Sequence, residues 1–185
     1  MTEQQPYDVI ETHDEFELRR YPEHLVAEIS VTAPFEEAGS RAFRALAGYI
    51  NGQNRSRSTV AMTAPVVQQA GSVRVAMTAP VLQSEGESDD YVIAFVLPSG
   101  MTAVTVPVPT DPHVRTRVVP MHVAAALRFS GRGSEDAFAR HLRALESALA
   151  SAGLSAVGSP RFARFDAPYV PGLLRRNEVV IGIEA

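Results

Sequence analysis

The sequence of 185 residues contains no cysteine, no tryptophan and no lysine. Without cysteine there is no disulfide framework, no thiolate nucleophile and no cysteine-ligated zinc, iron–sulfur cluster or haem. Without lysine, Schiff-base chemistry and a P-loop lysine are excluded as well. All 17 basic residues are arginine. Any anion that needs a fixed positive charge must therefore be bound by arginine or histidine.

A basic excess and long hydrophobic runs are also missing. The formal net charge of −4 argues against a nucleic-acid-binding protein, because such proteins usually carry a basic excess. No apolar stretch approaches the roughly 20 residues that span a bilayer. The first residues are polar and acidic, unlike those of a signal peptide. We therefore expect a cytoplasmic protein with no nucleic-acid partner and no membrane span.

Two segments have the apolar periodicity of amphipathic helices. The first runs from about Pro34 to Ile50, and Gly52 follows as a stop signal. The second runs from about Glu135 to Ala152, with Ser134 as its N-cap and Gly153 just beyond its end. Each helix carries one apolar stripe, so we expect each to pack against a sheet.

Most of the remaining chain has the composition of β-strands separated by turn and proline-rich segments. The unbroken apolar run YVIAFVL at Tyr91–Leu97 is typical of a central strand. The predicted strands are Asp8–Thr12, Phe16–Tyr21, Leu25–Val31, Tyr91–Leu97, Val114–Val119, Val123–Phe129, Arg161–Phe165 and Glu178–Ile183.

The chain repeats itself at low similarity. Aligning Pro22 with Pro120 places His24 on His122, and a strand and then a helix follow in both halves. One such unit cannot cover both its sheet and its helix, so two must share a core. We expect one domain over residues 1–185, built from related halves at about 7–98 and 113–185. The predicted fold is α+β with a pseudo-twofold axis, a curved, mainly antiparallel sheet and two helices.

A second repeat is short and close. The segments VAMTAPVVQ at Val60–Gln68 and VAMTAPVLQ at Val75–Gln83 match at eight of nine positions. They are predicted to form an antiparallel pair that carries Met62 and Met77 at equivalent places. Methionine adapts to flat or aromatic ligands, and the alternative is that both methionines belong to the core.

Together these segments make the sequence similar to the SOUL haem-binding family, and the doubled MTAPV resembles its bacterial branch. The resemblance implies a distorted eight-stranded β-barrel or paired sheet with two helices. It also implies binding of haem or other tetrapyrroles, without an established reaction. The segments that carry it are FELRRYP (16–22), YINGQN (49–54), both MTAPV copies, FVLPS (95–99), PTDPHV (109–114), LRFSG (127–131) and RRNEV (175–179).

Several residues that have been given a role in the family are replaced in this sequence. A histidine proposed as an axial iron ligand in the family corresponds here to Arg20, and arginine does not ligate iron. Basic residues suggested to meet the haem propionates correspond to Ser40, Gly48 and Val170. What the resemblance leaves is an apolar pocket between the first helix, the MTAPV segments and the loop 169–174. The haem-binding residues we expect are Arg41, Phe43, Ala47, Met62, Met77, Tyr169, Val170, Leu173 and Arg175.

Alternative roles exist for the polar candidates. His24 and His122 could face one another across the pseudo-twofold axis and ligate iron, or lie exposed at the starts of two strands. Arginines such as Arg41 and Arg175 are suited to ligand carboxylates, because the guanidinium fork matches their shape. The alternative is that they are solvated or paired with nearby acids such as Glu37.

Sequence motifs of enzymes are missing: there is no GxSxG, HExxH or GxGxxG pattern. The expected function is therefore non-enzymatic, with a tetrapyrrole held by burial rather than by coordination. One alternative is a general binder of lipophilic or cationic small molecules, in which Glu28 is the buried acid. The other is a ligand-free interaction scaffold, which would have a closed, filled core. A haem-dependent enzyme is more remote, because it needs an open iron site and a proton donor.

Overall fold

The structure, a computed structural model, describes residues 3–56, 71–86, 90–166 and 169–184. Two α-helices are present, α1 (Phe35–Ile50) and α2 (Glu135–Ser151), together with the 3-10 turn η1 (Gly172–Leu174). The strands are β1 (Glu3–Gln4), β2 (Asp8–Thr12), β3 (Glu17–Tyr21), β4 (His24–Val31), β5 (Asn54–Arg55), β6 (Thr78–Ala79), β7 (Val81–Glu85), β8 (Tyr91–Val96), β9 (Val108–Pro109), β10 (Arg115–Val119), β11 (His122–Ser130), β12 (Ala156–Arg164) and β13 (Arg176–Ile183).

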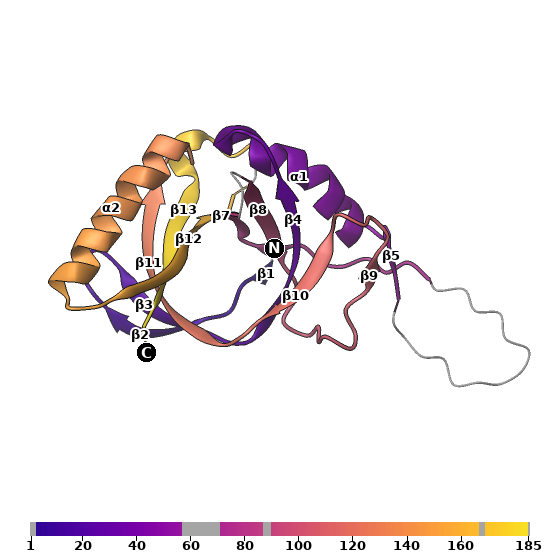
Figure 1. Ribbon diagram of the computed structural model, residues 1–185, viewed down its shortest axis with the longest axis horizontal. Coiled ribbons are helices and arrows are strands. Elements are labelled where there is room, and N and C mark those ends of the chain that lie inside the picture. The colour runs from indigo at the N-terminus through magenta and orange to yellow at the C-terminus, as the bar shows by residue number, and fades with distance from the viewer. Residues whose placement is uncertain (1–2, 57–70, 87–89, 167–168, 185) are drawn as a thin grey trace, which may run out of the picture.

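Nine of these strands form one curved sheet (Figure 1). Their order across the sheet is β10-β4-β8-β7-β12-β13-β11-β3-β2, and every neighbouring pair is antiparallel. The predicted α+β class is thus confirmed, and β8 lies inside the sheet between β4 and β7, as its apolar run predicted. In the described chain no helix is long and apolar enough to span a membrane.

The observed sheet differs in two respects from the distorted eight-stranded barrel or paired sheet that the resemblance implied. The sheet has nine strands, and it is open, with β10 at one edge and β2 at the other. All five residues of β2 are exposed. This strand therefore ends the sheet as a solvated edge and does not close it onto β10.

The strand order shows the pseudo-twofold relationship directly. From either side toward the middle of the sheet the order is β4-β8-β7 and β11-β13-β12, and the two sets meet between β7 and β12. The helices α1 and α2 follow β4 and β11 in the chain. The flanking strands are exchanged, because β3 pairs with β11 and β10 pairs with β4. This arrangement agrees with the repeat seen in the sequence.

Both predicted helices are confirmed to within about one residue. Pro34 precedes α1 as its N-cap, and Gly52 after its end has φ 111°, a conformation that glycine adopts without strain. The Ser134 side chain accepts a hydrogen bond from the Ala137 N–H at 3.3 Å and so caps α2. Local sequence therefore determines where both helices begin and end.

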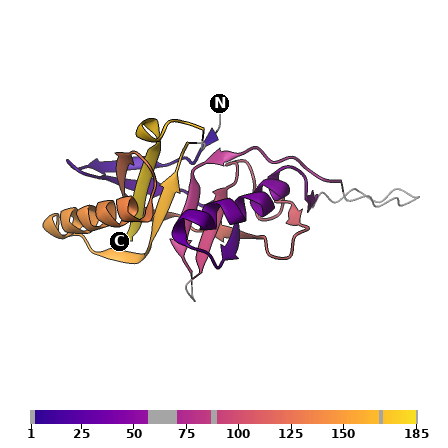
Figure 2. The same ribbon diagram turned by 90° about the horizontal axis from the view of Figure 1, so that it is seen from above.

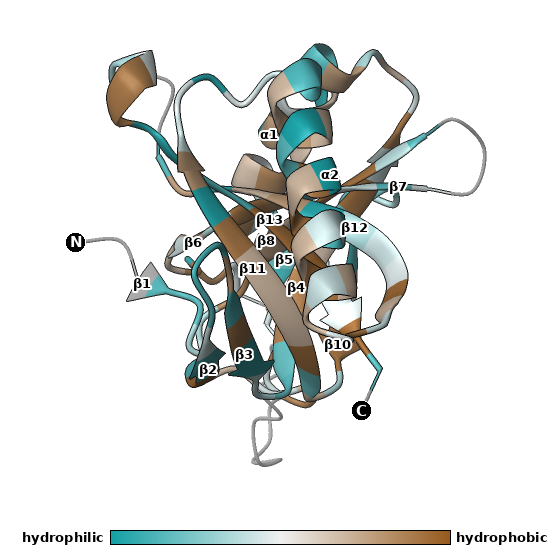
Figure 3. Cartoon of the chain, turned by 90° about the vertical axis from the view of Figure 1, so that its left-hand side faces the viewer, coloured by the Kyte–Doolittle hydropathy of each residue, from teal (hydrophilic) through white to brown (hydrophobic). Residues whose placement is uncertain are grey.

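Each helix covers its own apolar cluster on one face of the sheet (Figures 2 and 3). Phe162 on β12 packs beneath α2. Its directly opposed residue on β7 is Gln83, whose amide donates a hydrogen bond to the carbonyl of Phe35 at the start of α1. Directly opposed residues point to the same face, so both helices lie on the same side. Phe35, the first residue of α1, joins the two clusters, because its ring packs 5.6 Å from Tyr91 and 5.8 Å from Phe138.

The second MTAPV copy contributes β6 and β7, whereas Val60–Gln68 and Met62 lie outside the described residues. The predicted antiparallel pairing of the two copies is wrong for Val81–Gln83. Both edges of this segment are already hydrogen-bonded, to β8 on one side and to β12 on the other. For the rest of the two copies the pairing stays a prediction.

Candidate functional site

A cleft of about 730 Å³ opens beside α1, on the helix-covered face of the sheet. Its walls come from the first half of α1, from the segment around β6 and β7, and from the chain between β12 and β13. The described residues that line it are Phe35, Glu36, Gly39, Ser40, Phe43, Met77, Ala79, Val81, Ile93, Gly133, Arg164, Phe165, Asp166, Tyr169, Arg175, Arg176 and Asn177.

The apolar wall of the cleft is partly open to solvent. Phe43 on α1 is 48% exposed, and Met77 is 39% exposed. The rings of Phe43 and Phe95 pack edge to face, with their centroids 5.8 Å apart. The Phe43 side chain is therefore held in place although it is partly exposed. The alternative that Met77 is a core residue is therefore wrong, because the side chain faces the cleft.

Four of the nine predicted site residues line this cleft: Phe43, Met77, Tyr169 and Arg175. The predicted residues Arg41, Ala47, Val170 and Leu173 are not among the described lining residues, and Met62 lies outside the described chain. Residues from three distant parts of the sequence thus meet as predicted, and others on the same segments point elsewhere.

Helix geometry explains why Arg41 does not line the cleft. Gly39 and Ser40 lie four and three positions before Phe43, so the three residues share one face. Arg41 lies on another face, where its guanidinium pairs with Glu37 at 2.7 Å and both side chains are 55% exposed. The predicted alternative of a solvated surface ion pair is therefore the observed one for Arg41, and such pairs contribute little stability.

The loop before β13 is positioned by Arg175. Its Nε donates to the Val170 carbonyl at 2.8 Å. This bond ties the loop that carries Tyr169 to the start of β13. Tyr169, Leu173 and Leu174 are 89%, 86% and 72% exposed, an unusual exposure for three large apolar side chains. Tyr169 lines the cleft and provides apolar surface for a ligand there, whereas Leu173 and Leu174 are not among the described lining residues.

Arg164 is a cleft residue that sequence reasoning missed. It ends β12, and its side chain points to the helix-covered face, as Phe162 does two residues earlier. Burial lowers the pKa of Arg164 from its ordinary value to about 10, although the charge of Glu36 opposes this shift. The guanidinium remains charged at neutral pH. A lone arginine in a strand gives no signal in the sequence that would separate it from a surface arginine.

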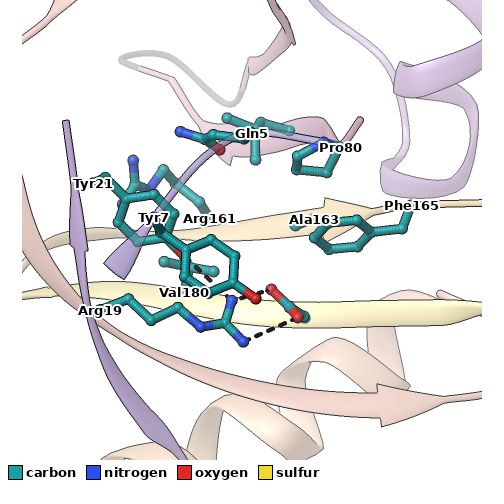
Figure 4. A pocket seen from close by; sticks show the side chains of 11 residues that line it. Gln5, Tyr7, Arg19, Tyr21, Pro80, Arg161, Ala163, Phe165 and Val180 are labelled. Carbon is teal, nitrogen blue, oxygen red and sulfur yellow. Dashed lines mark hydrogen bonds and ion pairs between the residues drawn. The ribbon is translucent and has the colours of Figure 1, made fainter. Parts of the chain in front are cut away.

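The other face of the sheet carries a network of buried charges around Glu178 on β13, which is 1% exposed. Figure 4 shows this region, with Arg19 labelled. Arg19 donates to Oε2 of Glu178 at 2.7 Å, and Arg176 donates to Oε1 at 2.6 Å. Burial alone lowers the pKa of Arg19, but hydrogen bonding and the charge of Glu178 raise it above the ordinary value. The cavity beside this network is about 10 Å³, which leaves no room for a ligand larger than about one water molecule.

His24 and His122 lie on this same face, as part of β4 and β11. Their rings are 5.9 Å apart, centroid to centroid, so of the two alternatives for these histidines the structure shows the facing pair, at the starts of the two strands. Arg161 Nη2 lies 2.9 Å from His122 Nε2, and Gln5 Nε2 lies 3.0 Å from His24 Nε2. Burial lowers the pKa of both histidines. The nitrogen that would ligate iron is therefore already hydrogen-bonded in each ring.

The lining residues fit a tetrapyrrole by their chemistry. Aromatic and sulfur-containing side chains match a flat apolar ring, and arginines match carboxylates. No histidine occurs among the described lining residues, whereas the Met77 thioether and the Tyr169 hydroxyl are groups able to ligate haem iron. Across the described residues, no group of three or more histidine or acidic side chains is placed to hold a metal ion.

Solved structures with a similar fold belong to proteins of different kinds. The C-terminal domain of EcmrR aligns with 96% of this chain and 98% of its own at 13% identity and a TM-score of 0.56. A hydrolase from Listeria innocua aligns with 95% of this chain and 94% of its own at 12% identity and a TM-score of 0.57. SAV2435 bound to tetraphenylphosphonium aligns with 92% and 94% of the two chains at 9% identity and a TM-score of 0.51.

At these identities the likeness concerns the fold alone. A search of curated proteins finds no significant match. The sequence profile of the SOUL heme-binding protein family, in contrast, matches residues 2–182, which is nearly the whole chain. The chain therefore belongs to the SOUL family.

Proposed function

We propose that this protein binds haem or another tetrapyrrole in the cleft beside α1 and catalyses no reaction on it. The observation that supports this most is the meeting of Phe43, Met77 and Tyr169, from three distant segments, around a cleft of about 730 Å³. Cofactor-sized ligands occupy clefts of roughly 300–1,000 Å³ with mostly apolar walls and a few polar groups.

Burial of the macrocycle provides the affinity in this proposal. Apolar surface contributes roughly 25 cal/mol per Å² removed from water, so a flat ring between Phe43 and Met77 needs no iron bond to be held. Haem would bring its iron, with Met77 or Tyr169 as the lining side chains able to contact it. Metal-free porphyrin should accordingly bind about as well as hemin.

A second candidate function is the binding of lipophilic cations. It is favoured by the similar fold of SAV2435, which is bound to tetraphenylphosphonium. Its expected anchor, Glu28, is 4% exposed but pairs with Arg117 at 3.0 Å and Arg115 at 3.3 Å. A buried acid that already has two cations offers a further cation little, so this candidate has the weaker support.

The third candidate, a ligand-free interaction scaffold, was expected to have a filled core between the first helix and the sheet. The open cleft beside α1 favours a ligand-binding protein over a scaffold.

Blocking the cleft tests the proposal. Gly39 lines the cleft, and a Cβ built there meets nothing within 4 Å, so Gly39→Trp places a bulky ring in the cleft without a clash at its root. Gly100→Trp is the matched control, because Gly100 is exposed, equally free around its Cβ and not a lining residue. Hemin and protoporphyrin IX are titrated by the Soret band, with tetraphenylphosphonium as competitor.

The expected result is binding of both porphyrins by the wild type and by Gly100→Trp, and a loss of about tenfold or more in Gly39→Trp. A wild type that leaves the Soret band unchanged contradicts tetrapyrrole binding. Equal affinity in the two variants contradicts the placement in this cleft. Displacement of porphyrin by tetraphenylphosphonium at similar concentration favours the cation-binding alternative.

A further inference from the structure

The arginines that line the cleft differ in whether an acidic side chain pairs with the guanidinium charge. Arg176 pairs with Glu178 at 2.6 Å. Arg164 donates to Gln83 Oε1 at 2.7 Å and to the Gly133 carbonyl at 3.2 Å, and both acceptors are uncharged. Across the described part of the chain, no acidic side chain forms an ion pair with Arg164.

The two acids among the described lining residues accept hydrogen bonds from backbone N–H groups, and Glu36 acts on Arg164 through its charge alone. Glu36 Oε1 accepts a hydrogen bond from the Glu135 N–H at 3.2 Å. Asp166 Oδ2 accepts one from the Arg176 N–H at 2.5 Å. Arg164 is therefore a partly buried cation whose charge is not matched by a bonded anion. Burial of such a charge is unfavourable, and a bound anion would offset that cost.

The Arg164 guanidinium is also held in one orientation. Gln83 is fully buried, and its Nε2 donates to the Phe35 carbonyl at 3.2 Å, which turns its Oε1 toward Arg164. The guanidinium carbon lies 5.2 Å from the centre of the Phe35 ring and 5.0 Å from that of Phe138. Only two of its five N–H groups donate in these bonds. A fixed guanidinium with N–H groups to spare suits a planar carboxylate.

We infer that Arg164 is the anion-recognition residue of the cleft and that it selects ligands in which a carboxylate is attached to a flat apolar body. This inference rests on the proposed function for the identity of that body, a tetrapyrrole. Arg164 thereby takes the role that the sequence assigned to Arg41 or Arg175. Arg41 pairs with Glu37 outside the lining, and the Nε of Arg175 donates to the Val170 carbonyl.

Esterification of the ligand tests this recognition in the wild-type protein. Protoporphyrin IX is compared with its dimethyl ester, and 1-pyrenebutyrate with its methyl ester, each by fluorescence titration at pH 7.5. Both acids are expected to bind about tenfold more tightly than their esters, because a charged hydrogen-bonded pair is lost on esterification. Equal affinity of acid and ester for every ligand that binds overturns the inference.

A variant assigns the preference to Arg164. In Arg164→Gln the acids are expected to bind no more tightly than the esters, and ester affinity should stay within about twofold of the wild type. Arg143→Gln is the matched control, because Arg143 is exposed on α2 and does not line the cleft. Circular dichroism checks the fold, and a preference for the acid that survives in folded Arg164→Gln overturns the inference. If that variant does not fold, the comparison of acid and ester in the wild type decides.

The two proposals fail in different ways. If both porphyrins bind without preference for the acid, tetrapyrrole binding stands and the role of Arg164 is refuted. If pyrenebutyrate binds more tightly than its ester but neither porphyrin binds, the carboxylate site stands and the proposed function is refuted.

Discussion

His24 and His122 form a pair across the pseudo-twofold relationship of the sheet, with ring centroids 5.9 Å apart. In each ring Nδ1 lies 2.9 Å from the carbonyl of the proline two residues earlier, Pro22 or Pro120. Nδ1 therefore carries the proton, and Nε2 is left to accept from Gln5 or Arg161. Burial keeps both rings neutral by lowering their pKa values.

Stability should therefore fall in mildly acidic solution. The unfolded histidines take up protons as the pH drops through about 6.5, while the folded ones, with lowered pKa values, resist until a lower pH. The histidine contribution is fully present above pH 6.5 and is lost below it, by at most about 1.4 kcal/mol per pH unit for each ring. Thermal unfolding midpoints at pH 7.5 and 5.5 measure this, and His122→Asn should roughly halve the dependence. An unchanged pH dependence in that variant would contradict the assignment.

Hemin binding should not depend on these histidines. Neither His24 nor His122 lines the cleft, and they lie on the sheet face that the helices do not cover. His24→Ala and His122→Ala are expected to keep hemin affinity within about twofold of the wild type, measured by Soret titration on folded protein. A loss of about tenfold in either variant would show that iron is ligated there.

Glu178 and Glu28 are both buried mid-strand, yet their loss should have unequal effects. Glu178→Gln removes the buried counterion of Arg19, which is 3% exposed, and leaves only the partly exposed Glu17 at 2.8 Å, so we expect a loss of about 3 kcal/mol in the free energy of unfolding. Glu28→Gln leaves Arg115 and Arg117, which are 66% and 54% exposed and can be solvated, so its cost should be only about 1 kcal/mol. Urea unfolding of both variants checks the ranking, and similar losses would contradict it.

Two glycine replacements should change stability in opposite directions. A Cβ at Gly39 meets nothing within 4 Å, so Gly39→Ala should raise the free energy of unfolding by about 0.5–1 kcal/mol through helix propensity. A Cβ at Gly182 would lie 2.8 Å from the Val157 carbonyl oxygen, so Gly182→Ala should lower it. Thermal unfolding of both variants measures the difference. If Gly39→Ala also retains porphyrin binding, any loss in Gly39→Trp comes from the size of the ring.

Local signals in the sequence predicted the elements well. Ser134 caps α2 and Gly52 follows α1 because capping and left-handed backbone depend on the residue at that position. The apolar run of β8 identified an interior strand, since only a strand covered on both faces tolerates it. The family and the approximate place of the cleft also came from the sequence, because two of the segments that carry the resemblance, the second MTAPV copy and RRNEV, supply lining residues.

Tertiary structure alone decided the polar chemistry of the cleft. Arg41 and Arg164 cannot be distinguished by residue type, and only the packing leaves one beside exposed Glu37 and the other against two phenylalanine rings. The same holds for the open edges of the sheet and the exchange of β3 and β10, which depend on pairing between strands far apart in the chain. Local residue preferences set where elements begin and end, whereas burial and charge pairing depend on which distant segments meet.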